Sequence, residues 1–193
     1  PTEASTQTIF DMISADQFYV EQGEFVQWPA AKGYEMVVPN SSVTVLSLPW
    51  TGSALPVWYQ NDAKIRNAKS VTGFTNRTLM EGVVAVWEHY EANLKDLPVE
   101  EQKAALSAVA SQQQPGMPPR ENPLVHRCFD RCIGTGGLNQ VTVSIYSTRA
   151  YQQTGLLQAV AAKQLIGGHQ RGVGFQSACS AFGYKVLLNA LEG

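Results

Sequence analysis

The sequence predicts an α+β fold, with a mixed, mostly antiparallel sheet that is covered by helices on one face. Two observations lead to this class. Strand-like segments gather in groups instead of alternating one by one with helices, and the stretches between the groups place apolar residues at helical spacing. Because 193 residues with 44% hydrophobic content can bury one core, we expect a single domain over residues 1–193.

The first part of the chain is expected to form one short helix and then several strands. Residues 5–15, STQTIFDMISA, place Ile9, Met12 and Ile13 at helical spacing. Segments that are rich in β-branched or aromatic residues, and that are bounded by turn-forming residues, predict the strands. These segments are YEMVVP, SVTVLSLPW, PVWYQ and AKSVTGFTN.

Two amphipathic helices are expected next. Thr78 and Glu81 have the spacing of a capping box, which starts a helix with an apolar stripe over about four turns. Pro98 opens the second helix because its ring fixes φ, and the glutamates behind it suit the positive end of the helix dipole. We expect this helix to run to about residue 111.

Residues 112–123 have the composition of an exposed connector, rich in glutamine and proline. Beyond it, HRCFDRCIG and QVTVSIYS alternate with period two on either side of GTGGLN, which predicts an antiparallel hairpin. Two further helices are expected at residues 150–166 and 175–191.

The glycines between these two helices raise the question of a nucleotide site. Gly172-x-Gly174-x-x-Ser177 nearly matches a dinucleotide-binding fingerprint, which needs a strand running directly into the glycine turn. Here a helix comes first, so we expect the glycines to end that helix and to reverse the chain. We therefore predict no Rossmann domain and no cofactor-binding residue in this chain. An anion at the start of the last helix is the remaining functional interpretation.

Composition excludes several function classes. A net charge of −2 and a pI near 5.9 give no basic surface for nucleic acid, so DNA and RNA are not expected partners. No apolar run is long enough to span a bilayer, and the first residues lack the pattern of a signal peptide. The odd number of cysteines, three, fits a soluble protein of a reducing compartment, either cytoplasm or an organelle interior.

The residues that commonly carry chemistry form no recognisable catalytic motif. Cys128 and Cys132 fall on an expected strand, where residues four apart are separated by about 13 Å, so we expect no metal site there. The three histidines are scattered, and no serine lies in a nucleophile elbow, which leaves the catalytic residues unknown. Trp50, Trp58 and Tyr59 gather near two prolines and a glycine, where they line a ligand pocket or pack as a corner of the core.

The order of several motifs resembles the C-terminal, non-nucleotide portion of saccharopine dehydrogenase-like proteins. The resemblance covers nearly the whole chain and is most specific at Ala150 to Gly155 and at Ala181-Phe182-Gly183. Its motifs are MISADQF, LPWTGSALPVWY, TGFTNRTLMEGV, AYQQTGLLQAVAAKQLI and RGVGFQSACSAFG.

The resemblance implies the substrate-binding and dimerisation domain of an oxidoreductase. Proteins of that family carry an N-terminal Rossmann domain that binds NAD(P), and this sequence lacks that part, so we expect it upstream or on another chain. Hydride transfer by this chain alone is not expected, because the cofactor supplies the chemistry. The residues proposed to bind a polar or anionic substrate are Trp50, Asn76, Arg77, His126, Arg127, His169 and Arg171.

A second hypothesis comes from a different class of function. The missing cofactor site and the missing catalytic motif also fit a former enzyme domain that persists as a non-catalytic structural or interaction subunit of a larger assembly. Both hypotheses expect a homo-oligomer or a subunit of a larger complex.

Overall fold

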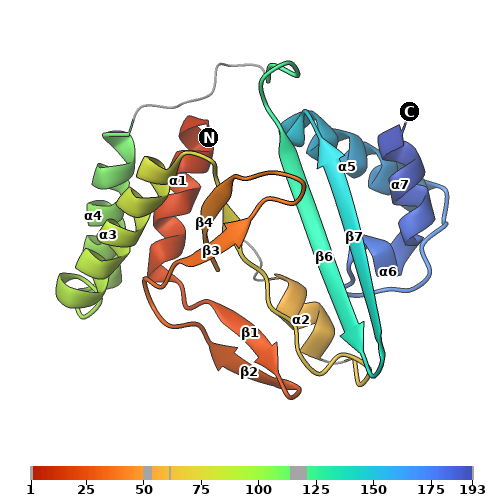
Figure 1. The fold of residues 1–193 in the computed structure, drawn as a ribbon, viewed down its shortest axis with the longest axis horizontal. Helices are drawn as coiled ribbons and strands as arrows, with labels where there is room; N and C mark the ends of the chain where they lie inside the picture. Colours follow the sequence, from red (N-terminus) through yellow and green to blue (C-terminus); the bar gives the residue numbers. More distant parts are fainter. Residues whose placement is uncertain (1, 50–53, 61, 114–120, 193) are drawn as a thin grey trace. The chain divides into compact units, whose positions relative to one another are not determined.

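The predicted α+β class is confirmed by the computed structural model, which describes residues 2–49, 54–60, 62–113 and 121–192. All strand pairings among these residues are antiparallel, and no parallel sheet of the Rossmann type occurs in them (Figure 1). The chain divides into two compact units, Pro1–Gly116 and Met117–Gly193. The expectation of one domain over residues 1–193 stays a prediction.

The first unit combines helices with two small antiparallel sheets. Its predicted first helix is confirmed, although it starts earlier than the sequence suggested and ends in a 3-10 turn. The helical elements are α1 (Glu3–Asp11), η1 (Met12–Ser14), α2 (Ala54–Gln60), α3 (Arg77–Asn93) and α4 (Val99–Ser111). The strands are β1 (Phe18–Glu21), β2 (Glu24–Gln27), β3 (Tyr34–Val37), β4 (Thr44–Leu48) and β5 (Thr72–Gly73).

The strands pair locally, with two-residue and longer turns between them. β1 and β2 form a hairpin whose turn residues, Gln22 and Gly23, both have positive φ, as a type I′ turn requires. β4 lies between β3 and β5 in the second sheet. Val20 of β1 also bridges to Ala68, so that the chain before β5 runs beside the hairpin.

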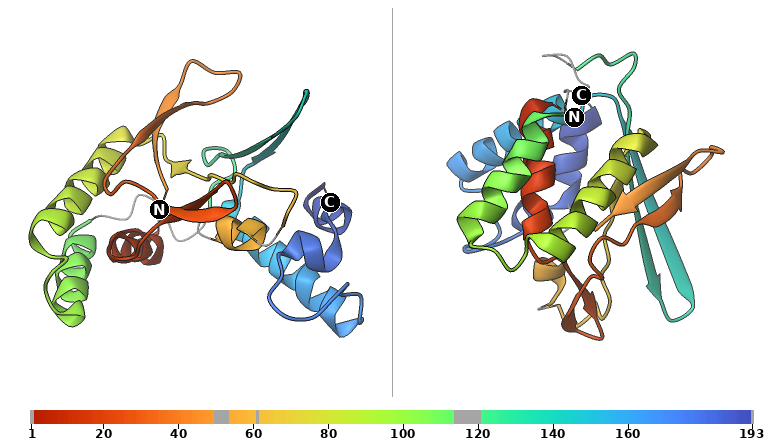
Figure 2. Two further views of the ribbon diagram at one scale, coloured as in Figure 1. Left: turned by 90° about the horizontal axis from the view of Figure 1, so that it is seen from below. Right: turned by 90° about the vertical axis from the view of Figure 1, so that its left-hand side faces the viewer.

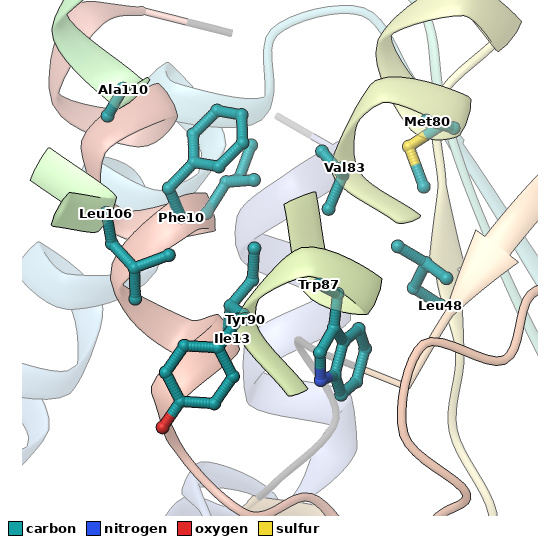
Figure 3. Close-up of a cluster of buried hydrophobic side chains, with 10 residues drawn as sticks. Phe10, Ile13, Leu48, Met80, Val83, Trp87, Tyr90, Leu106 and Ala110 are labelled. Atoms are coloured by element: carbon teal, nitrogen blue, oxygen red, sulfur yellow. The ribbon is translucent and has the colours of Figure 1, made fainter. Parts of the chain in front are cut away.

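The core of the first unit lies between three helices and one strand. α1 and η1 contribute Ile9, Phe10 and Ile13, and these side chains meet the apolar faces of α3 and α4 (Figure 3). α3 supplies the longest row, which also covers Leu48 of β4. This row consists of Met80, Val83, Trp87 and Tyr90. Burial of these side chains is the main stabilising term of the unit.

One polar side chain is buried in this core with all of its hydrogen-bonding atoms used. The amide Nε2 of Gln102 donates to the carbonyl oxygens of Lys95 and Leu97, at 2.9 and 2.8 Å. Its Oε1 accepts from the hydroxyl of Tyr90 at 2.7 Å. Gln102 thereby joins α4 to α3 and to the turn between them.

The second unit contains a long hairpin and three helices. β6 (Cys128–Gly136) and β7 (Asn139–Ser147) confirm the predicted hairpin, and α5 (Ala150–Ile166) confirms the predicted helix. α6 (Ala178–Phe182) and α7 (Tyr184–Glu192) complete the unit, and the three helices pack against one another (Figure 1). The described ends of the expected connector are structured, because Glu121 accepts hydrogen bonds at the start of α5 from the backbone of Tyr151 and Gln152, each at 3.0 Å.

The glycine-rich segment reverses the chain as predicted. α5, a helix, leads into it, and Gly168 and Gly174 have positive φ values of 67° and 90°. The last helix, expected as one element over residues 175–191, is instead broken at Gly183, whose φ is 87°. That conformation strains any residue with a Cβ, and the guanidinium of Arg171 lies where such a Cβ would point.

Three other local predictions are corrected. PVWYQ was expected to be a strand, but it belongs to α2, which packs on β1 and β2. The expected strand AKSVTGFTN is reduced to β5 and the single bridge at Ala68. The capping box is wrong, because Asn76 caps α3 through a hydrogen bond from Leu79, while the carboxylate of Glu81 pairs with Arg77.

Replacing Gln102 with alanine should lower the free energy of unfolding of the first unit. The change leaves the Tyr90 hydroxyl and two turn carbonyls without their partner, which costs about 2 to 4 kcal/mol. Urea denaturation followed by circular dichroism measures the loss. The control Gln113→Ala removes an exposed glutamine just beyond α4 and is expected to have little effect; equal losses in the two variants would contradict the role of Gln102.

Candidate functional site

A pocket of about 300 Å³ lies in the first unit, beside the core. Its wall comes from three places in the chain: η1 with the residues that follow it, the end of β2 with Trp28, and the C-terminal part of α3 with the turn to α4. The pocket therefore joins segments around residues 13–17, 27–30 and 87–96 that are far apart in the sequence.

Acidic groups dominate the charge of the pocket. Asp16, Glu91 and Asp96 line it, against the single ammonium group of Lys95. Glu91 and Lys95 form an ion pair at 3.2 Å, and a carboxylate oxygen of Asp16 accepts from Gln27 Nε2 at 2.7 Å. The hydrogen bond to Glu91 raises the pKa of Lys95, so the ammonium form is favoured. Asp96 also acts on the charge of Lys95, so one ammonium group faces three carboxylates among the described lining residues.

The same acidic groups act on a tyrosine in the wall. Burial raises the pKa of Tyr90, and the negative charges of Glu91 and Asp16 raise it further. The phenol therefore stays neutral and donates its proton to Gln102. The field at this wall disfavours an additional negative charge and favours a positive one.

Aromatic side chains form the apolar part of the wall. Trp28, Trp87 and Tyr90 are all buried and line the pocket. Trp28 also packs against Tyr19 and Tyr34, with ring centroids 4.6 and 5.2 Å apart. Aromatic faces attract cations as well as apolar groups.

This aromatic cluster already holds a cation of the chain itself. The ammonium of Lys69 lies 4.2 Å from the ring centre of Tyr19 and 6.0 Å from that of Trp28. Its carboxylate partner is Glu21, at 3.2 Å. Next to the pocket, the ring of Tyr19 and the carboxylate of Glu21 therefore together bind the ammonium group of Lys69.

Gln17 is the most unusual residue of the lining. Its side chain is 5% exposed, and its Nε2 donates to the carbonyl oxygen of Ala15 at 3.1 Å. This bond fixes the orientation of the amide, and it leaves the buried Oε1 with no hydrogen-bond partner within the described part of the chain. A buried acceptor without a donor costs about 1 to 3 kcal/mol, so this amide lowers the stability of the fold locally.

None of the described residues that the sequence suggested as substrate binders lines this pocket. Asn76 caps α3, and Arg77 beside it binds Glu35 at 2.7 Å and Glu81 at 2.8 Å. The pKa of Glu35 is lowered mainly by its hydrogen bond from Arg77. Trp50 lies outside the described residues.

The other suggested residues belong to the second unit, where backbone contacts occupy several of their groups. His126 Nδ1 accepts from the backbone of Asn122 at 2.9 Å, and Arg127 donates to the carbonyl oxygens of Pro123 and His126. His169 Nδ1 lies 3.1 Å from the side-chain oxygen of Gln164. A substrate-binding role for these residues stays a prediction.

The anion interpretation of the last glycines gains no support from the geometry. α6 has five residues, and the hydroxyl of Ser177 already accepts from the backbone of Ser180. Arg171 donates its backbone N–H to Ala181 in the same segment. Trp58 and Tyr59 are half-buried on α2, and neither lines the pocket of the first unit.

Cys128 and Cys132 lie on β6 as expected, and the three cysteines are free thiols. Within the described ranges, no three His, Cys, Asp or Glu side chains gather as metal ligands would. None of the helices described is both long and apolar enough to cross a bilayer.

The pocket was missed by sequence reasoning because its residues form no motif. Asp16 and Gln17 follow a short helix, whereas Glu91, Lys95 and Asp96 surround the end of another helix more than seventy residues later. The spacing of Glu91 and Lys95 signals an ordinary surface ion pair on a helix. Only the packing of η1 against α3 brings the two groups together.

Comparison with known proteins gives one family match. A family of unknown function, DUF5938, matches residues 1–193. No curated protein and no solved structure matches the chain.

The raised pKa of Tyr90 predicts a pH dependence of stability. Because the folded pKa lies above the ordinary value of 10.0, the contribution of Tyr90 is fully present below about pH 10 and is lost as the pH rises through the folded pKa. The free energy of unfolding should therefore fall more steeply above pH 10 in the wild type than in Tyr90→Phe. Tyr184→Phe, which changes an exposed tyrosine of the second unit, is the control. Identical slopes in the wild type and Tyr90→Phe would exclude this effect.

Proposed function

The chain belongs to this family of unknown function, DUF5938, and we propose that it is the substrate-binding and dimerisation part of a saccharopine dehydrogenase-like oxidoreductase. The NAD(P)-binding half of that enzyme is supplied by another segment or another chain. In this proposal the pocket of the first unit receives a cationic group of the substrate, such as a primary ammonium.

The observation that carries the proposal is the composition of the pocket. Its carboxylates outnumber its single ammonium, and buried aromatic side chains lie beside them. An ammonium group gains from both, because carboxylates attract its charge and aromatic faces attract it over the ring.

The separate roles of the cofactor-binding half and of this chain follow from the chemistry of hydride transfer. The cofactor carries the hydride, and the protein binds and orients the partner molecule. Charged and aromatic groups on the packed elements η1 and α3 are suited to holding a substrate in one orientation. The motif resemblance at Ala150 to Gly155 and at Ala181 to Gly183 also supports the oxidoreductase assignment. The free thiols fit a reducing compartment, cytoplasm or an organelle interior.

A second candidate function is a non-catalytic interaction subunit of a larger assembly. It is favoured by the second unit, where large apolar side chains are exposed on several elements and no residue of α5 or α7 is buried. Surfaces of this kind mark contacts with other proteins. The most exposed side chains are Leu138, Val173, Ile166 and Leu124.

Binding of two small probes of opposite charge tests the pocket. We expect n-butylammonium to bind at least about tenfold more tightly than butyrate, because like charges in the wall repel the carboxylate. Quenching of tryptophan fluorescence reports binding, since Trp28 and Trp87 line the pocket. Asp16→Asn and Asp96→Asn should each weaken binding of n-butylammonium about threefold to fivefold, as expected for the loss of one partly exposed charge.

The matched control for these variants is Glu88→Gln. Glu88 is an exposed carboxylate on α3 that does not line the pocket, so the control also removes one negative charge. Equal weakening by Glu88→Gln would show that only the overall charge matters. Equal binding of the two probes would show that the pocket does not distinguish their charges. Either result would exclude this pocket as a cation site.

The oxidoreductase assignment is tested on the complete gene product together with any chain that copurifies in fixed ratio. We expect NADH or NADPH fluorescence to increase when that assembly is added, because a nicotinamide site shields the ring from water. Residues 1–193 alone give the matched control, with no expected increase. A complete assembly that leaves the fluorescence of both cofactors unchanged would favour the interaction subunit instead.

A further inference from the structure

We infer that the outer edge of β7 pairs with β7 of a second copy of this chain, across a two-fold axis at Val143, to form one four-stranded antiparallel sheet. This interface would be the surface through which the proposed oxidoreductase forms its dimer. The pairing itself is argued from β7 alone, and only its role in that enzyme rests on the proposed function.

The hairpin is a sheet that lacks neighbours. β6 and β7 pair over nine residues each, and no other strand in the described ranges joins them. A two-stranded sheet is only marginally stable in water, since it needs further strands or a packed face. Figure 2 shows the distal part of the hairpin extending away from α5, α6 and α7, so these helices leave its edges uncovered there.

The two edges of the hairpin differ in their protection. β6 carries Asp130 and Arg131, and charged side chains on an edge strand discourage pairing with another chain. A two-fold axis at either residue would also place like charges opposite each other. β7, Asn139–Ser147, has no charged residue and no proline. The edge that lacks these protective features is therefore that of β7.

The sequence of β7 is complementary to itself in the antiparallel direction. With the axis at Val143, Val141 faces Ile145 of the second copy, and Thr142 faces Ser144. Gln140 then faces Tyr146, and Asn139 faces Ser147, so that polar residues meet polar or amphipathic ones. Opposed β-branched residues and opposed hydroxyls are favourable cross-strand pairs. A two-fold interface requires this kind of self-complementarity.

The pairing also extends an apolar face. Val141, Val143 and Ile145 lie on one face of the hairpin, and their partners on β6 are Gly134, Cys132 and Asp130. Val141 is 63% exposed and Val143 is 51% exposed in the single chain. Joining two copies places three β-branched side chains of each copy in one continuous row, which reduces their exposure to water.

The test uses a charge at the centre of the proposed axis. Val143→Lys and Val143→Glu each place two like charges opposite each other, which should weaken the dimer much more than tenfold. A mixture of the two variants in equal amounts should restore it, because lysine then faces glutamate. Sedimentation equilibrium over micromolar concentrations measures the masses, and circular dichroism checks that each variant is folded.

A matched control separates the β7 edge from general effects of charge. Ile133→Lys introduces the same charge at a residue of β6 that is 50% exposed, almost as exposed as Val143, and it should leave the dimer intact. A monomeric wild type, a dimer that tolerates Val143→Lys, or a mixture of the two Val143 variants that stays monomeric would each overturn the inference.

The same samples distinguish this inference from the proposed function. Val143 lies in the second unit, whereas the pocket belongs to the first, so the Val143 variants should bind n-butylammonium like the wild type. A monomeric wild type that binds this probe would overturn the interface alone. A dimer that depends on Val143 but shows no preference for the probe would overturn the pocket alone.

Discussion

The amide of Gln102 holds the turn between α3 and α4, and the pocket of the first unit depends on that turn. Gln102 Nε2 donates to the carbonyl oxygens of Lys95 and Leu97. These hydrogen bonds hold the backbone beside the charged part of the pocket in place. Because Oε1 accepts from Tyr90, the same side chain also holds the aromatic part of the wall. A buried polar group with all its bonds made favours one arrangement of the helices over others. The position of the candidate site is therefore a consequence of core packing.

Most elements of the fold could be predicted where local signals agree with the final structure. α4 begins after Pro98, α5 matches its expected bounds, and the hairpin of β6 and β7 follows from simple alternation. The failures occur where tertiary contacts decide. PVWYQ has the composition of a strand, yet without a neighbouring strand it forms α2 and packs on the first hairpin. That hairpin was missed because its turn places Gln22, an uncommon residue for positive φ, in the left-handed region.

The candidate site could not be predicted, because its residues come from distant segments that form a pocket only after the chain has folded. Asp16 follows a short helix like many surface carboxylates, and Glu91 with Lys95 has the spacing of a common ion pair. Gln17 gives no signal in the sequence, since its importance depends on burial and on the hydrogen bond that orients its amide. Asn76 and Arg77 were predicted as substrate binders because they are polar. In the structure Asn76 caps a helix and Arg77 forms an exposed ion pair.

The carboxylate of Glu121 connects the two ends of the segment that contains the β6–β7 hairpin. Its two oxygens accept from the backbone N–H groups of Tyr151 and Gln152 in the first turn of α5, about thirty residues further along the chain. The segment between them, which contains the hairpin, is therefore held at both ends by hydrogen bonds and not by a covalent bond. Unlike a covalent crosslink, this contact exists only in the folded state, so folding itself meets the entropy cost of closing a loop of about thirty residues. Residues added or removed in matched pairs at the hairpin tip leave this contact unchanged. The length of the hairpin can therefore be changed at its tip without breaking the hydrogen bonds at its base.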